Sequence, residues 1–105
     1  MSLKKYEQEV ITRLLDGRVS DEELSNLLIY SAVNNYEFTG VGYFLELSCP
    51  DLKLEKETID EPVLIGKSGG IEVGFHLFVD KETITFECHG WGRGNLPENI
   101  RELDF

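Results

Sequence analysis

Cationic side chains are scarce in this sequence. Its 105 residues include 20 Asp and Glu but 10 Lys and Arg, which gives a formal net charge of -10. A surface with this excess of negative charge repels phosphate backbones and anionic lipid headgroups. The sequence therefore argues against nucleic acid and membrane surfaces as partners. Electrostatic attraction would steer a basic protein toward this one, although the charge could serve solubility alone.

Cysteines are also few, and long apolar runs are missing. Cys49 and Cys88 are the two cysteines, and they form no CxxC motif, so they are weak evidence for a metal or redox site. No apolar stretch approaches the roughly 20 residues of a membrane-spanning helix. The first residues, MSLKK, run into a charged helical pattern and do not resemble a signal peptide. We therefore expect a cytoplasmic protein with reduced thiols.

A β-hairpin is the clearest pattern that the chain does contain. Apolar residues occupy every second position over residues 71–79, and the alternation resumes over residues 84–88. Both apolar sets face the same core only if Val79 lies opposite Ile84. The tip lacks the Asn-Gly or Asp-Gly of a tight turn, so we expect a four-residue loop over residues 80–83.

Two helices are expected before the sheet. Apolar residues recur at intervals of three and four over residues 4–16. Ser20 and Glu23 have the spacing of a capping box, which predicts a second helix from about Asp21 to Val33. This second helix begins Asp-Glu-Glu and has no Lys or Arg, so the pair is not a DNA-binding helix-turn-helix.

The remaining segments complete an α+β fold. Residues 41–48 and 63–65 read as strands, and the charged run over residues 53–61 reads as a loop or a weak edge strand. Residues 96–103 favour a helical turn with Pro97 at its first position. We predict a single domain over residues 1–105, with an N-terminal αα-hairpin packed on one face of a four- to five-stranded, mainly antiparallel sheet.

The hairpin register gathers three titratable side chains on the face away from the predicted core. His76 lies opposite Glu87, and His89 lies diagonally across from His76. Two imidazoles and a carboxylate are the ligand set of several zinc and non-haem iron sites, and they could equally form a base oriented by an acid. Their spacing matches no metalloenzyme motif, and a cross-strand His–Glu pair needs no function to explain it. The triplet is a candidate metal site, and the sequence requires no cofactor.

Aromatic side chains provide a second group of candidates. Phe44 and Phe78 point away from the predicted core, so either a segment covers the second sheet face or an apolar patch is exposed there. We expect a cover, formed by residues 53–61 or by the C-terminal turn. Trp91 and Arg93 are residue types that anchor protein interfaces, although Trp91 could instead close one end of the core. The candidate partner-binding residues are Phe44, Glu72, Phe78, Trp91 and Arg93.

Nothing in the sequence points to nucleophilic or nucleotide chemistry. The glycine-rich run over residues 90–94 lacks the spacing of a phosphate-binding loop, and no GxSxG motif is present. Cys88 faces the predicted core, where a thiolate is disfavoured. We therefore predict that the protein is not an enzyme.

Four segments resemble a pattern found in small uncharacterised bacterial proteins. They are GVGYFL at 40–45, GFHLFV at 74–79, ECHGWG at 87–92 and LPENIR at 96–101. Some small acidic α+β proteins of this kind are immunity proteins, which neutralise secreted toxins, and the resemblance implies such a role here. Toxin nucleases are basic because they bind phosphate, so an acidic inhibitor can associate with them quickly.

The sequence as a whole predicts a non-catalytic interaction protein with a basic partner, of which an immunity-type inhibitor is the concrete form. One alternative is a small enzyme or metal-binding protein that uses His76, Glu87 and His89. Another is a homo-oligomer that buries Phe44 and Phe78 between copies.

Overall fold

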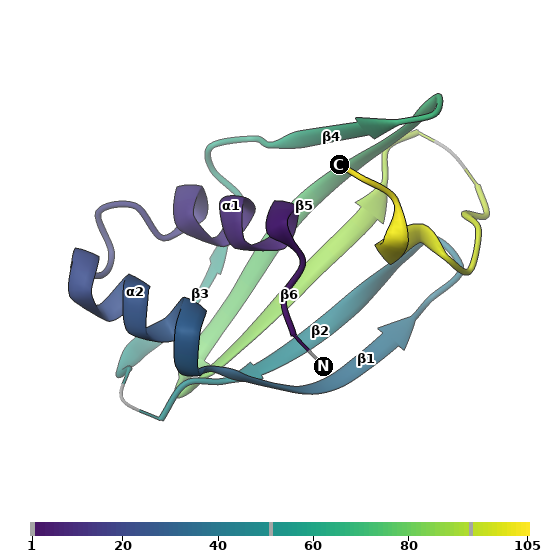
Figure 1. Ribbon diagram of the computed structural model, residues 1–105. Helices are drawn as coiled ribbons and strands as arrows, with labels where there is room; N and C mark the ends of the chain where they lie inside the picture. The colour runs from purple at the N-terminus through teal and green to yellow at the C-terminus, as the bar shows by residue number, and fades with distance from the viewer. Residues whose placement is uncertain (1, 51, 93) are drawn as a thin grey trace.

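An antiparallel sheet of six strands carries two helices on one of its faces in the computed structural model, which describes residues 2–50, 52–92 and 94–105 (Figure 1). The predicted α+β class is therefore confirmed, including the two N-terminal helices and the short C-terminal turn. No helix in the described ranges is long and apolar enough to cross a membrane.

Both helices begin within one residue of their predicted starts, which the periodicity gave for the first and the capping box for the second. Helix α1 spans Lys5–Leu14, and the backbone N–H of Lys4 donates to Glu7 Oε1 at 2.7 Å. Helix α2 spans Asp21–Tyr30. Its capping box is complete, because Ser20 N–H donates to Glu23 Oε1 at 2.8 Å and Glu23 N–H donates to Ser20 Oγ at 3.0 Å. The predicted end near Val33 is three residues too late, since the chain becomes extended at Ser31.

The sheet has the order β1-β2-β6-β5-β3, and the short strand β4 also pairs with β5. Strand β4 pairs with the beginning of β5, whereas β3 pairs with its end, so the two share one edge of the sheet. The strand bounds are β1 Ala32–Phe38, β2 Gly42–Ser48, β3 Leu54–Ile59, β4 Ile65–Ser68, β5 Ile71–Lys81 and β6 Thr83–Gly90, and a 3-10 turn η1 follows at Ile100–Glu102.

The predicted hairpin register is confirmed along β5 and β6, with Val79 opposite Ile84 and His76 opposite Glu87. The predicted four-residue loop is wrong. Asp80 pairs with Thr83, so a two-residue turn joins the strands, and its first residue, Lys81, has a positive φ of 57°. A left-handed residue lets a tight turn follow the twist of the strands, even where the sequence lacks the usual Asn-Gly signal.

The core lies between the sheet and the two helices. The inward side chains of the strands are buried there against α1, α2 and the C-terminal residues, and Tyr43, Leu45, Leu77, Ile84 and Phe86 are fully buried. Phe105 packs against the rings of Tyr6 and Phe75 on this side. Figure 1 shows η1 and the C-terminus on the helical side of the sheet.

We call the opposite side of the sheet the outer face. The expected cover over it is not formed by either predicted segment, because the charged run provides strand β3 of the sheet itself and η1 packs on the helical side. Phe78 and Ile65, which point outward from β5 and β4, are 38% and 46% exposed.

Candidate functional site

Three titratable side chains meet on the outer face where β5 and β6 run side by side. The pairing places His76 opposite Glu87, and Gly74 opposite His89. His76 Nδ1 lies 3.3 Å from Glu87 Oε1, and the two imidazole rings are stacked with centroids 4.7 Å apart. One potential ligand atom from each residue lies within 4.8 Å of the others. We refer to His76, Glu87 and His89 as the His–Glu–His cluster.

Gly74 provides the space in which the His89 ring lies. A Cβ atom at position 74 would be 3.0 Å from His89 Cε1 and Nε2, and 3.1 Å from a ring carbon of Trp91. These distances are tighter than nine in ten Cβ contacts in proteins, so a larger residue would push both rings aside by a few tenths of an ångström. The glycine therefore allows His89 to reach across the strand pair toward His76.

The electrostatic environment favours a neutral His89. Burial lowers the pKa of His89 below its usual value, the charge of His76 acts in the same direction, and Glu87 opposes them. Its Nδ1 atom is buried and has no hydrogen-bond partner among the described residues. A neutral imidazole with an unshared nitrogen can accept a proton or bind a metal ion.

The aromatic candidates surround this cluster. Phe44 on β2 pairs with Glu87 on β6. The ring centroids of Phe78 and His76 are 6.4 Å apart in an edge-to-face arrangement, and those of Trp91 and His89 are 6.0 Å apart. Trp91 is 46% exposed and so does not close the core.

Glu72 lies on the same face, where its backbone carbonyl accepts from Trp91 N–H at 2.9 Å. Arg93 lies outside the described residues. The outer-face patch, as we define it, consists of Phe44, Glu72, His76, Phe78, Glu87, His89 and Trp91.

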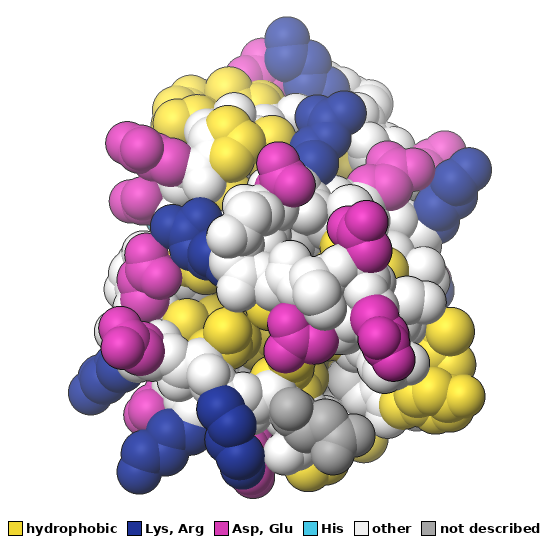
Figure 2. All heavy atoms as spheres, turned by 90° about the vertical axis from the view of Figure 1, so that its left-hand side faces the viewer, with side chains coloured by type: hydrophobic (Ala, Val, Ile, Leu, Met, Phe, Trp, Pro, Cys, Tyr) yellow, Lys and Arg dark blue, Asp and Glu magenta, His cyan; other side chains and the backbone are white. Residues whose placement is uncertain are grey.

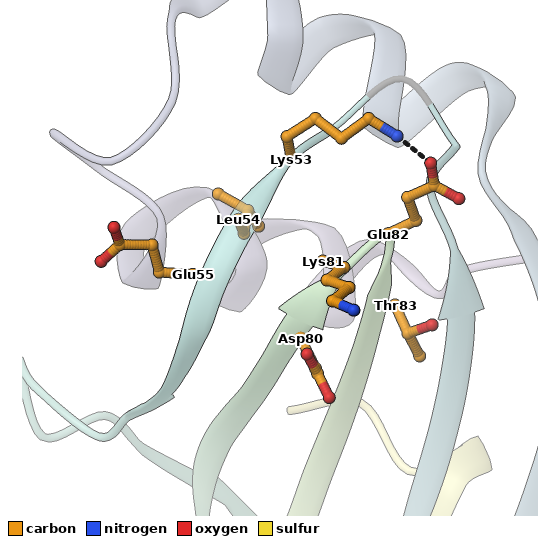
Figure 3. A pocket seen from close by; sticks show the side chains of 7 residues that line it. All are labelled: Lys53, Leu54, Glu55, Asp80, Lys81, Glu82 and Thr83. Carbon is orange, nitrogen blue, oxygen red and sulfur yellow. Dashed lines mark hydrogen bonds and ion pairs between the residues drawn. The ribbon is translucent and has the colours of Figure 1, made fainter.

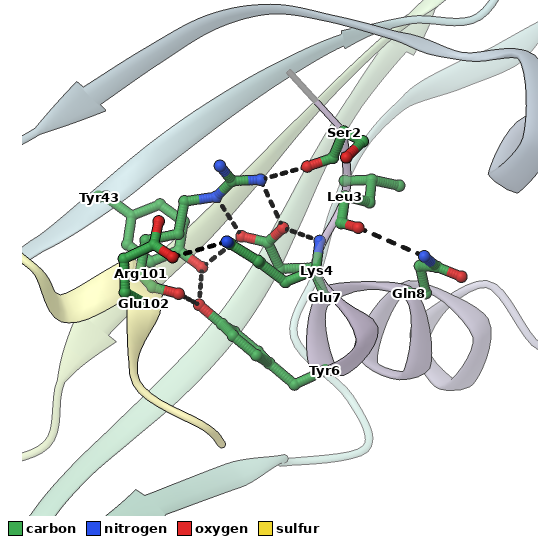
Figure 4. A network of polar contacts seen from close by, with 9 residues as sticks. All are labelled: Ser2, Leu3, Lys4, Tyr6, Glu7, Gln8, Tyr43, Arg101 and Glu102. Carbon is green, nitrogen blue, oxygen red and sulfur yellow. Dashed lines mark hydrogen bonds and ion pairs between the residues drawn. The ribbon is translucent and has the colours of Figure 1, made fainter.

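The least expected feature is a buried polar network on the opposite side of the sheet. Glu7 from α1 is fully buried, and Arg101 from η1 contacts both of its carboxylate oxygens (Figure 4). The Tyr43 hydroxyl donates to Glu7 Oε2 at 2.6 Å, and the Tyr6 hydroxyl donates to the Arg101 carbonyl at 2.9 Å. Burial raises the pKa of both tyrosines. Enclosed groups with satisfied hydrogen bonds hold the fold together and offer no access to a substrate.

The two thiols are not poised for nucleophilic chemistry. Cys49 and Cys88 are free and buried. Burial raises the pKa of Cys49 to about 11 and that of Cys88 to about 12, so both thiols stay protonated near neutral pH.

The open hollow formed by Lys53–Glu55 and residues 80–83 does not provide a second candidate site. This hollow lies at the tip of the β5–β6 hairpin, where Lys53 forms an ion pair with Glu82 (Figure 3). The Glu55 carboxylate points away from this pair, so the charged groups around the hollow do not converge on one point.

Figure 2 shows the end of the molecule with the α1–α2 connection, where acidic and basic side chains are interspersed. Arg18 and Glu57 form an ion pair between the α1–α2 connection and β3, at 3.0 Å.

No family model matches this chain, and no curated protein or solved structure matches it significantly.

Proposed function

We propose that this protein is a non-catalytic, cytoplasmic interaction module that binds a basic protein through its outer-face patch. The observation that carries the proposal is the position of three aromatic side chains, Phe44, Phe78 and Trp91, on a sheet face that the two predicted cover segments leave open. Phe78 and Trp91 are exposed and Phe44 is half-buried beside them. Aromatic residues with a polar rim are typical of the energetic centre of a protein interface.

The charge on this face supports a basic partner. Register places five carboxylates on it, and the cations Lys56 and Lys67 lie at its edge, on β3 and β4. Lys67 Nζ is already within 3.9 Å of Glu72. The carboxylates are those of Glu37, Glu46, Glu72, Asp80 and Glu87. Their field attracts a basic surface and speeds its association.

The same charge disfavours a second copy as the occupant. Each chain carries a formal charge of -10, so two outer faces repel one another before their aromatic residues can meet. This repulsion weakens the homo-oligomer alternative relative to the basic partner.

An immunity-type inhibitor is the most specific form of the proposal. A nuclease toxin presents a basic surface to bind its phosphate backbone, and an acidic sheet face with aromatic anchors could cover that surface. The two free cysteines are compatible with the reducing cytoplasm, where such an inhibitor would protect the cell that makes it.

The test is affinity capture of proteins from the source organism's lysate on this protein, at low and at high salt. The captured protein is then purified and its binding is measured by calorimetric titration. The double variant Phe78→Ala/Trp91→Ala should weaken binding by more than about tenfold, because each change removes an exposed aromatic anchor. The matched control is Ile29→Ala/Tyr30→Ala, since these side chains are 65% and 77% exposed on α2. It should bind like the wild type.

Charge reversal gives a second measurement on the same complex. Glu46→Lys should slow association and reduce its dependence on salt, because Glu46 is an exposed carboxylate of the outer face. The proposal fails if the patch variants bind as tightly as the wild type, or if the α2 variants lose as much affinity. Concentration-dependent sedimentation of the isolated protein would instead favour the homo-oligomer.

A further inference from the structure

We propose that His76, Glu87 and His89 bind one divalent transition-metal ion, of which Zn²⁺ is the best fit, on the outer face of the sheet. This inference does not depend on the proposed partner. It follows from the ligand types, from the distances between their ligand atoms, and from a ring nitrogen of His89 that is buried and unpaired among the described residues.

The ligand set suits zinc. Imidazole nitrogen and carboxylate oxygen are both common zinc ligands, and two histidines with one acid recur in sites that keep an open coordination position. Three side chains from this chain would leave a fourth position for water or for a group from another molecule. Metal ions that prefer only sulfur ligands or only oxygen ligands are a poorer match, because the cluster contains neither a thiol nor a second carboxylate.

The separation of the first two ligands already has the dimension of a metal site. His76 Nδ1 and Glu87 Oε1 are 3.3 Å apart. A hydrogen bond between charged groups is shorter, at about 2.7–2.9 Å. Two ligands at bond lengths of about 2.0–2.1 Å in a tetrahedral site are about 3.3 Å apart. His76 and Glu87 form a long hydrogen bond in this arrangement, and an ion between them would leave their spacing almost unchanged.

His89 is the third ligand and the one that must adjust. The ligand atoms of the cluster lie within 4.8 Å of one another, which exceeds the roughly 3.3 Å edge of a tetrahedral zinc site, so a small rotation of a ring is needed. The ring lies above Gly74, which puts no side chain beneath it. Its Nδ1 atom is buried with no hydrogen-bond partner among the described residues, so no protein group competes with an ion for this nitrogen.

The supporting backbone is rigid. All three ligands come from β5 and β6, which pair with each other and lie inside the sheet between β2 on one side and β3 and β4 on the other. Side chains on paired central strands keep their spacing, and this lowers the cost of organising a metal site. The competing explanation is a cross-strand His–Glu pair that binds nothing.

The chain offers a clean test, because its two histidines are both in the cluster. Full-length protein treated with a chelator and then dialysed is titrated with Zn²⁺ alone in a calorimeter, and with Co²⁺ alone in an absorption spectrometer. We expect one ion per chain and a cobalt spectrum without a thiolate charge-transfer band. The ring-proton signals of both histidines should shift together in the NMR spectrum as Zn²⁺ is added.

Variants locate the ion. His76→Ala and His89→Ala should each weaken Zn²⁺ binding at least tenfold, and Glu87→Gln should weaken it as well. Glu46→Gln and Glu72→Gln are matched controls on the same face, and they should bind like the wild type. If circular dichroism shows that a histidine variant folds poorly, Gly74→Ala replaces it in the titration. This change displaces the His89 ring while keeping all three ligands in the chain, so it should also weaken Zn²⁺ binding.

The inference is overturned if the wild-type protein does not bind Zn²⁺ at micromolar concentrations, or if His76→Ala/His89→Ala binds it unchanged. Binding that is lost equally in Glu72→Gln would also overturn it, since that result indicates diffuse attraction to surface carboxylates. The titration contains no partner protein, so its failure leaves the proposed interaction module standing. Loss of partner binding in Phe78→Ala/Trp91→Ala likewise leaves the metal result intact.

Discussion

Arg101 forms a two-point ion pair with Glu7 across 94 residues of sequence. Arg101 Nε lies 2.8 Å from Glu7 Oε2, and Nη2 lies 2.9 Å from Oε1. Burial acts to lower the pKa of Arg101, but the hydrogen bonds and charge of Glu7 outweigh it and raise that pKa. The guanidinium therefore stays charged inside the protein, and its partner must supply the compensating charge.

Replacing Glu7 should destabilise the protein strongly. Glu7→Gln leaves the buried Arg101 charge uncompensated, which costs about 3–5 kcal/mol. Urea denaturation measures this as a lower free energy of unfolding. The control is Glu102→Gln, which breaks the exposed Lys4–Glu102 pair and should change stability little. Equal losses in the two variants would contradict a special role for the buried network.

Adding one carbon atom at position 74 should disturb the outer face. Gly74→Ala brings a Cβ within 3.0 Å of the His89 ring and 3.1 Å of Trp91, and overpacking of this kind costs about 1–3 kcal/mol. The fluorescence of Trp91, the one tryptophan of the chain, should change with it. At Gly94 an added Cβ meets no atom within 4 Å, so Gly94→Ala should be close to wild type. Unchanged fluorescence in Gly74→Ala would argue against the described packing.

Stability should fall as the pH is lowered through the range where His89 titrates. Its folded-state pKa lies below the usual histidine value of about 6.5, so protons bind more readily to the unfolded state. The free energy of unfolding therefore decreases from about pH 6.5 down to the folded-state pKa, and His89 contributes no further change below it.

Ring-proton NMR checks this directly, because the chain has two histidines. One signal should titrate below the usual range, and it should be the signal that disappears in His89→Asn. A His89 signal that titrates in the usual histidine range would contradict the prediction. Glu57 and Glu102 also have lowered pKa values, because of their hydrogen bonds to Arg18 and Lys4, but they titrate in a more acidic range.

The hairpin tip should tolerate glycine better than lysine. Lys81 has a φ of 57°, which favours glycine, so Lys81→Gly should raise the free energy of unfolding by up to about 1 kcal/mol. Lys67→Gly is the matched control, since Lys67 lies within strand β4 and glycine weakens a strand. Thermal unfolding of both variants should show opposite shifts.

The parts of this fold that could be predicted from the sequence are those in which apolar residues recur at a regular spacing. The β5–β6 register follows from alternation on both strands, and it placed the His–Glu–His cluster correctly on one face. The predicted partner-binding residues Phe44, Phe78 and Glu72 lie on that face for the same reason. The exposure of the face could not be predicted, because it depends on where segments distant in sequence pack.

Strand β1 and the buried network were missed for physical reasons. The sequence predicted a helix up to about Val33 and no strand before residue 41, but β1 runs through Asn34 and Asn35. Its register shifts between Val33 and Asn35, as an exposed edge strand allows. No sequence motif singles out Glu7, and a charged side chain on an amphipathic helix is normally exposed. Its position is one turn before Val10 and Ile11 on the buried side of α1, and that spacing was the available signal.

The buried network also bears on how long the native state lasts. Contacts between positions 94 residues apart close a long loop, whereas the β5–β6 hairpin forms from neighbouring segments. We therefore expect the hairpin to be organised early and the Glu7–Arg101 contact to form after the main folding barrier. Removing that contact should accelerate unfolding while leaving the folding rate nearly unchanged, so the network governs the lifetime of the folded protein rather than the speed of reaching it.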